Sequence, residues 1–173
     1  MASSSSSHTI ALKKYDVFIS FRGEDTRAGF SSHLYAALCR NNFNTYIDYR
    51  IERGKEVWEE IVKAIKDSTQ FLVVFSENYA SSTWCLNELV EIMECHKNEQ
   101  DSIVVIPVFY QIEPSNVRKQ TGSYGSALAK HKKQDKVKIQ RWKDVLCEAA
   151  SLSGFHYSTM HGYMYCCFCF YQF

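Results

Sequence analysis

The stretch YDVFISFRGEDTR occupies residues 15–27 and reads as a strand, a turn and the start of a helix. Tyr15–Phe21 is a short run rich in aromatic and β-branched residues, which is typical of a strand buried on both faces. The polar half contains Gly23, where the backbone can turn tightly, followed by Asp25 or Thr26 as a helix cap. This order predicts an open α/β sheet, in which ligands bind beyond the carboxyl ends of the strands.

The rest of the chain continues the alternation of strands and helices. Further strands are predicted at Phe43–Asp48, Gln70–Phe75, Ile103–Tyr110 and, on the weakest pattern, Ser153–Tyr157. Helical spacing of apolar residues appears around Phe30–Leu38, Trp58–Ile65, Trp84–Met93, Ser126–His131 and Ile139–Ala150, and Gln111–Gly125 reads as a loop with a helical turn after Pro114. The alternation predicts a parallel sheet with right-handed crossovers. Pro107 lies inside the fourth strand and predicts a bulge or a sheet edge there.

Composition places the chain among globular proteins. It has 173 residues, 46% hydrophobic and 23% charged, and a net charge of +1, which gives no electrostatic reason to expect nucleic acid as the main partner. No run is long enough to span a membrane. Seven cysteines without a signal peptide predict reduced thiols in the cytoplasm, with the nucleus as an alternative.

Several kinds of site are disfavoured by the motifs. No glycine-rich dinucleotide or phosphate-binding loop follows a strand. Cys166, Cys167 and Cys169 lack a second pair of ligands at zinc-finger spacing, so no metal site is expected. Residues 1–12 predict a flexible serine-rich leader, and residues 156–173 an aromatic, cysteine-rich tail.

The motifs resemble those of plant TIR domains, the signalling domains at the N-terminus of many plant immune receptors. The resemblance rests on YDVFISFRGEDTR, IERG, VVFSENYASSTWCLNEL, IPVFYQIEPSNVRKQTGSYG and WKDVLCEAASLSG, and it covers residues 13–155 in order. It implies a flavodoxin-like fold with strand order 2-1-3-4-5 and helices on both faces. Because no nucleotide-binding or leucine-rich segment follows, a TIR-only or truncated member is expected.

The resemblance also implies that the domain cleaves NAD+, as substrate rather than cofactor, when it self-associates with its own copies or with other TIR domains. It places the catalytic glutamate at Glu88. It places the substrate-binding residues at Phe21, Arg22, Gly23, Asp48 and Trp84. The so-called BB loop, which gates the site and contacts neighbouring domains in relatives, includes Ile51, Arg53 and Gly54, and a self-association pair falls at Ser32 and His33.

The chemistry of this residue set agrees with that implication. Trp84 and Glu88 are four residues apart, so they share a helix face, which the pattern turns away from Leu86, Leu89 and Met93. A carboxylate can stabilise the oxocarbenium-like transition state of glycosidic cleavage, and nicotinamide leaves NAD+ without protonation. Trp84 can stack on a ring, and Arg22 can contact phosphate.

Simpler interpretations remain open for each residue. Glu88 can be a solvated helix carboxylate, Trp84 a core residue, and Arg22 part of a surface ion-pair cluster with Glu24, Asp25 and Arg27. Two functions therefore follow. The first is an NAD+ nucleosidase active as an oligomer in plant innate immunity, releasing nicotinamide and ADP-ribose-type products. The second is a non-catalytic adaptor that binds other TIR domains.

Overall fold

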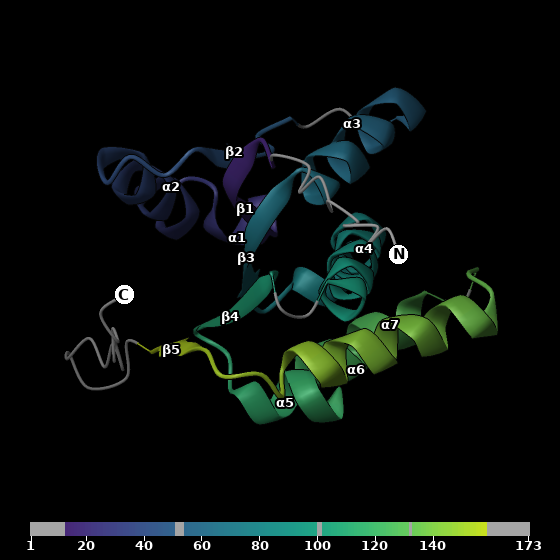
Figure 1. Ribbon diagram of the computed structural model, residues 1–173. Helices are drawn as coiled ribbons and strands as arrows, with labels where there is room; N and C mark the ends of the chain where they lie inside the picture. Colours follow the sequence, from purple (N-terminus) through teal and green to yellow (C-terminus); the bar gives the residue numbers. More distant parts are fainter. Residues whose placement is uncertain (1–12, 51–53, 100–101, 132, 159–173) are drawn as a thin grey trace, which may run out of the picture.

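The computed structural model describes residues 13–50, 54–99, 102–131 and 133–158 (Figure 1). Its strands are β1 (Tyr15–Phe21), β2 (Thr45–Ile47), β3 (Ser68–Phe75), β4 (Val104–Tyr110) and β5 (Phe155–Tyr157). Its helices are α1 (Gly23–Thr26), α2 (Phe30–Arg40), α3 (Lys55–Lys66), the 3-10 turn η1 (Tyr79–Ser81), α4 (Thr83–Asn98), α5 (Pro114–Lys119), α6 (Gly122–Lys130) and α7 (Lys136–Ala149). The predicted leader and the tail from residue 159 lie outside the described residues.

The five strands form one parallel sheet in the order β2-β1-β3-β4-β5, which confirms the predicted fold class. The two edge strands are three residues each, so β2 is shorter than the predicted Phe43–Asp48. The segment predicted as the loop Gln111–Gly125 is largely helical, because α5 begins at Pro114 and α6 at Gly122.

Pro107 does not break the sheet. The register between β3 and β4 runs without interruption from Gln70↔Val104 to Phe75↔Phe109, so the predicted bulge is wrong. The ladder between β4 and β5 starts only at Val108↔Phe155. On that side of β4, Pro107 therefore precedes the paired residues, and its missing N–H costs no bond in the ladder with β5.

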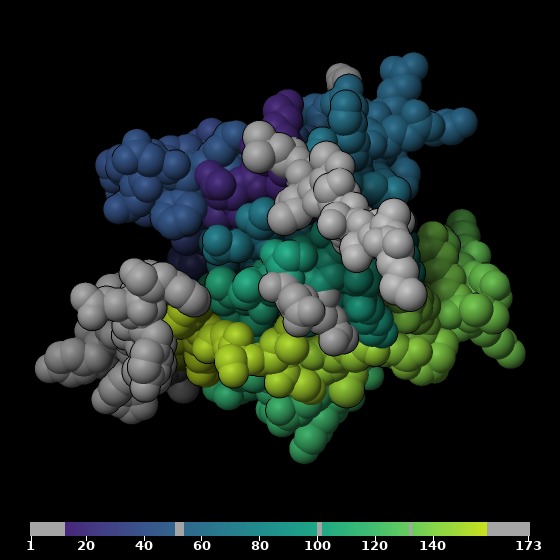
Figure 2. Space-filling model, in the orientation of Figure 1, coloured from purple at the N-terminus to yellow at the C-terminus, as the bar shows by residue number. Residues whose placement is uncertain are grey.

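The sheet separates two apolar cores of unequal size. Alternate residues of the central strands, such as Phe18 and Phe71, face α3, α4, α6 and α7, and these form the larger core. The other set, such as Ile19 and Val74, meets Phe30 and the rest of the apolar side of α2. Figure 1 shows α2 on one side of the sheet and α3, α4 and α7 on the other. In the space-filling view, the blue region of α2 and the green region of α7 lie at opposite sides of the molecule (Figure 2). Helices therefore cover both faces, as predicted.

Candidate functional site

The carboxyl ends of β1 and β3 lie side by side, since Phe21 pairs with Val74 in the parallel ladder. The chain after β1 forms α1, and the chain after β3 leads through η1 into α4. The crossovers from these two strands run in opposite directions in the 2-1-3-4-5 order. In open α/β sheets this switch point is where ligands bind.

Asp25 joins the two connections. Its carboxylate accepts hydrogen bonds from Ser76 Oγ at 2.6 Å, from the Asn78 backbone N–H at 2.9 Å and from Asn78 Nδ2 at 3.1 Å. The prediction that Asp25 caps the following helix is wrong, because the N-cap of α2 is Gly29 and no side chain caps it. Local spacing could not show this, because the partners of Asp25 are about 50 residues away in the sequence.

Replacing Asp25 by Ala is expected to lower the free energy of unfolding by about 1–3 kcal/mol, because it leaves polar groups of the β3–α4 connection without an acceptor. Chemical denaturation measures the change. Glu24→Ala is the matched control: the Glu24 side chain is 75% exposed and pairs with Arg22 at the surface, so a loss below about 1 kcal/mol is expected. Equal losses in the two variants would contradict the role given to Asp25.

Glu88 lies in a buried polar cluster at the end of β1. Only 6% of Glu88 is exposed, and Ser20 Oγ, which is fully buried, donates to Glu88 Oε2 at 2.9 Å. Ser20 Oγ also lies 2.9 Å from the Tyr79 hydroxyl, which donates to the Cys85 carbonyl at 3.1 Å. Burial raises the pKa of the Tyr79 phenol well above its ordinary value, so this hydroxyl keeps its proton.

The interpretation of Glu88 as a solvated helix carboxylate is therefore wrong. So is the expectation that its side of the helix turns away from the core, because the buried residues of α4 include Cys85, Leu86, Glu88, Leu89, Ile92 and Met93. Helical periodicity assigns a glutamate to the polar side by default. The signal that could have placed it is Ser20, a hydroxyl on the same face of β1 as the core residue Phe18.

Trp84 stands one turn before Glu88 and is half-buried against the larger core. Its ring meets the Trp58 ring of α3 edge to face, with centroids 5.3 Å apart and planes at 82°. Ser82 caps the helix there by accepting from the Cys85 backbone N–H. The structure thus places Trp84 and Glu88 on the same first turns of α4, with Trp84 nearer the surface.

Arg22 and Gly23 follow directly from the buried Phe21. Arg22 pairs with the exposed Glu24 at 2.6 Å, which agrees with the ion-pair interpretation. Its Nε, like that of Arg27, is buried without a hydrogen-bond partner among the described residues. A Cβ on Gly23 would lie 2.5 Å from Arg27 Nη2, so glycine lets this guanidinium pack over the turn. Two guanidinium groups with unused donors therefore flank the turn after β1.

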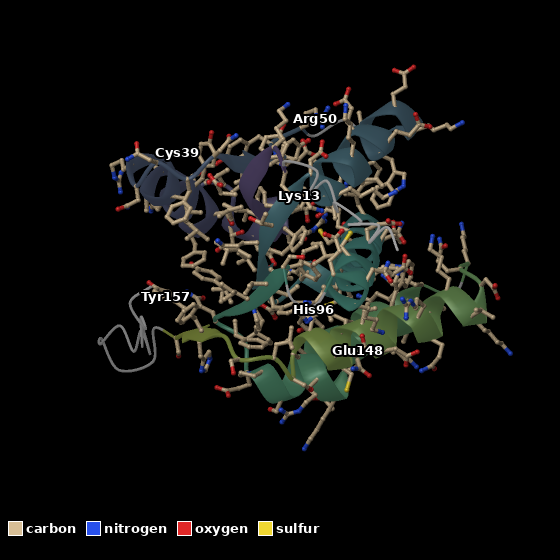
Figure 3. The ribbon with its side chains drawn as sticks, viewed as in Figure 1. Lys13, Cys39, Arg50, His96, Glu148 and Tyr157 are labelled. Atoms are coloured by element: carbon tan, nitrogen blue, oxygen red, sulfur yellow. The ribbon has the colours of Figure 1, made fainter. Side chains whose placement is uncertain are left out.

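Asp48 follows β2 and comes directly after the Ile19↔Ile47 pair, so it lies beside Ser20 at the carboxyl edge of the sheet. Its side chain is 9% exposed and accepts from Arg50 Nε at 2.8 Å, while Arg50 Nη1 reaches Glu60 on α3. These two carboxylates raise the pKa of the Arg50 guanidinium above its ordinary value. An open hollow of about 520 Å³ is lined by these residues with Tyr46, Ile47 and Tyr49, and Arg50 projects beside α3 in Figure 3. The hollow contains neither Glu88 nor Trp84.

The remaining predicted residues are placed in part. Ile51 and Arg53 lie outside the described residues. Gly54 is the exposed N-cap of α3 in an extended conformation, φ −170°, that any residue can adopt. On α2, His33 is exposed, whereas Ser32 is half-buried, donates to the Arg27 carbonyl and accepts from the Tyr49 hydroxyl at 3.3 Å. Within the described ranges, Cys39, Cys95 and Cys147 are free thiols, whereas the Cys85 thiol donates to the Phe21 carbonyl at 3.5 Å.

The described residues contain neither a group of metal ligands nor a membrane-spanning helix. Within residues 13–158, leaving out the undescribed gaps, no three His, Cys, Asp or Glu side chains are grouped so as to hold a metal ion. In the same part of the chain, no helix has the length and apolar character needed to cross a bilayer.

The strand order and the helices on both faces define a doubly wound, flavodoxin-like α/β domain, and comparison with known families identifies its family. The TIR domain family model matches residues 14–163. The chain belongs to the TIR domain family, and its relatives are of the plant disease-resistance type.

Two relatives illustrate the match. The chain is 54% identical to disease resistance protein RUN1 of Vitis rotundifolia over 141 residues, which is 81% of this chain and 11% of that protein. It is 51% identical to TMV resistance protein N of Nicotiana glutinosa over 158 residues, which is 89% of this chain and 13% of that protein. The chain thus spans little more than a tenth of the length of these relatives.

A solved structure agrees with the fold. The TIR domains of the activated Roq1 resistosome, which directly recognises the pathogen effector XopQ, match with a TM-score of 0.76 and 45% identity. The match covers 86% of this chain and 91% of that one. The fold of most of this chain therefore matches that of the TIR domains in the Roq1 resistosome.

Proposed function

We propose that this chain is an NAD+ nucleosidase that acts as a self-associated TIR domain in plant defence signalling. The observation that carries the proposal is Glu88, a carboxylate buried at the switch point and held by Ser20 and the start of α4. Moving a carboxylate out of water carries a desolvation cost, and proteins often bury such groups at functional sites. Clefts at this position are where α/β proteins bind nucleotides.

The reaction needs little beyond this group. The bond between ribose C1′ and nicotinamide N1 breaks, and nicotinamide leaves as a neutral molecule with the bonding electrons. Glu88 stabilises the positive charge that develops on the ribose, and water adds to C1′ with loss of a proton. The products are nicotinamide and an ADP-ribose-type compound. The guanidinium groups of Arg22 and Arg27 flank the turn after β1 and support a place for the pyrophosphate nearby.

The burial of Glu88 is a reason to expect activity only when the domain self-associates. Glu88 is 6% exposed in the single chain, and neither the hollow beside Arg50 nor the hollow between Lys119 and Lys143 includes it. Substrate access therefore needs a rearrangement, which packing of a second domain against α2 or the β2–α3 connection can supply. The exposed His33 on α2 is a candidate contact. We place this activity in the cytoplasm, with the nucleus as an alternative.

The first test is nicotinamide release from NAD+ by the purified chain at rising protein concentration. We expect the specific activity to increase with concentration, because two copies must meet before the site opens. His33→Ala should reduce that increase without lowering the melting temperature. Absence of nicotinamide at every concentration, from folded protein that associates, would contradict the enzymatic proposal.

The same burial of Glu88 favours a second candidate, a TIR–TIR binding module without catalysis. In that case Glu88 would be a structural group inside the cluster with Ser20 and Tyr79. The concentration series separates the two candidates, because association without nicotinamide release is the result that a binding module gives.

A further inference from the structure

We infer that Ser20 is a positioning residue for the Glu88 carboxylate, with Tyr79 as the group that orients Ser20. The inference rests on the proposed function, because it assigns how the proposed catalytic carboxylate is held. Ser20 is the penultimate residue of β1, and Phe18, two residues earlier on the same face, belongs to the larger core. Ser20 is fully buried, so its hydroxyl reaches Glu88 but not the solvent.

The contacts form a chain of oxygens. Glu88 Oε2 lies 2.9 Å from Ser20 Oγ, which lies 2.9 Å from the Tyr79 hydroxyl, which lies 3.1 Å from the Cys85 carbonyl. The last link is local, since Tyr79 and Cys85 flank the turn that starts α4. The middle link ties this turn to β1. The strand β1 and the start of α4 therefore fix the position of the Glu88 carboxylate together.

Counting protons shows why both hydroxyls are needed. When Glu88 is ionised, two hydroxyl protons serve the three contacts: Ser20 donates to the carboxylate, and the Tyr79 proton is shared between Ser20 Oγ and the Cys85 carbonyl. When Glu88 is protonated, three protons serve three contacts, with each hydroxyl donating one step further along the chain. The cluster keeps its geometry in both states, because every oxygen retains a partner.

Position matters in this kind of catalysis. A carboxylate that stabilises a cationic transition state acts through its distance from ribose C1′, and a displacement of about 1 Å can cost about 100-fold in rate. Ser20 cannot contact the substrate itself, because it is 0% exposed beneath the end of the strand. Its removal should therefore lower kcat and leave KM unchanged.

The experiment compares Ser20→Ala and Ser20→Thr with Ser68→Ala. Ser68 is the matched control: it is also a fully buried strand serine, but its hydroxyl donates to the Ala64 carbonyl at 2.7 Å, away from Glu88. We expect Ser20→Ala to lower kcat about 10- to 100-fold at constant KM. Ser20→Thr, which keeps a hydroxyl, should restore most of the rate, and Ser68→Ala should have no effect on kcat.

A second measurement does not need activity. The carboxyl ¹³C resonance of Glu88, assigned by its disappearance in Glu88→Gln, should shift at neutral pH in Ser20→Ala and stay in place in Ser68→Ala. An unmoved resonance, or an equal loss of kcat in Ser68→Ala, would overturn the role of Ser20. A shifted resonance in a chain whose wild type releases no nicotinamide would overturn the proposed function and leave the hydrogen bond established.

Discussion

Glu88→Gln is expected to lower nicotinamide release by about 100-fold or more, the size of effect seen when a group that stabilises transition-state charge is removed. The amide has the shape of the carboxylate but no charge to offset the charge that develops on the ribose. Its carbonyl oxygen can still accept from Ser20. The fold should therefore survive, with the free energy of unfolding lowered by no more than about 1 kcal/mol.

Initial rates and chemical denaturation, measured on one protein preparation, check both parts of this result. Glu94→Gln is the control: Glu94 lies on α4 as well, but it is exposed and pairs with Arg141 at 3.0 Å. It should retain wild-type activity. If Glu88→Gln were as active as the wild type, Glu88 would be a structural group and the catalytic assignment would fail.

Gly154→Ala is expected to destabilise the fold by about 1–3 kcal/mol, the usual cost of inserting a methyl group into a filled space. A Cβ at residue 154 would lie 2.2 Å from the Pro107 carbonyl oxygen and 2.5 Å from Pro107 Cγ. The carbonyl belongs to β4, which is paired with β3 on its other side, so it cannot retreat. The residue after Gly154 starts β5, and the clash therefore acts on the pairing of this short strand.

The midpoint of urea unfolding measures this cost. Gly54→Ala serves as the matched control, because nothing lies within 4 Å of a Cβ at that position and its backbone is extended. Alanine is less favourable than glycine at a helix N-cap, so Gly54→Ala should lower the midpoint slightly, and by less than Gly154→Ala. If both alanine variants unfolded at the wild-type midpoint, the close approach of Gly154 to Pro107 would not exist in solution.

The sequence was most informative about the central strands. β1, β3 and β4 are continuous apolar runs bounded by polar residues, and this pattern can be recognised without knowing how the strands pack. The edge strands were harder to bound, because three residues such as Thr45–Ile47 carry almost no periodicity. The helical content of Gln111–Gly125 was underestimated, since α5 and α6 are short and lack a clear apolar stripe.

The residues of the site were less predictable than their neighbourhood. The motif match placed Trp84 and Glu88 at the start of one helix, and the structure puts them there. The burial of Glu88 depends on Ser20, 68 residues away, and the true partners of Asp25 are equally distant along the chain. Such pairs follow from the strand order and register, which no local spacing encodes.

The edge-to-face contact of Trp58 with Trp84 gives the molecule an optical marker. Two indoles held at a fixed angle couple their excited states and produce a paired circular-dichroism signal that separate indoles lack. Trp58 belongs to α3 and Trp84 to the start of α4, so the signal depends on the relative orientation of these two helices, the second of which carries Glu88. Trp142, the third indole, is fully buried on α7 and donates its ring N–H to Asn87 Oδ1 on α4 at 3.1 Å.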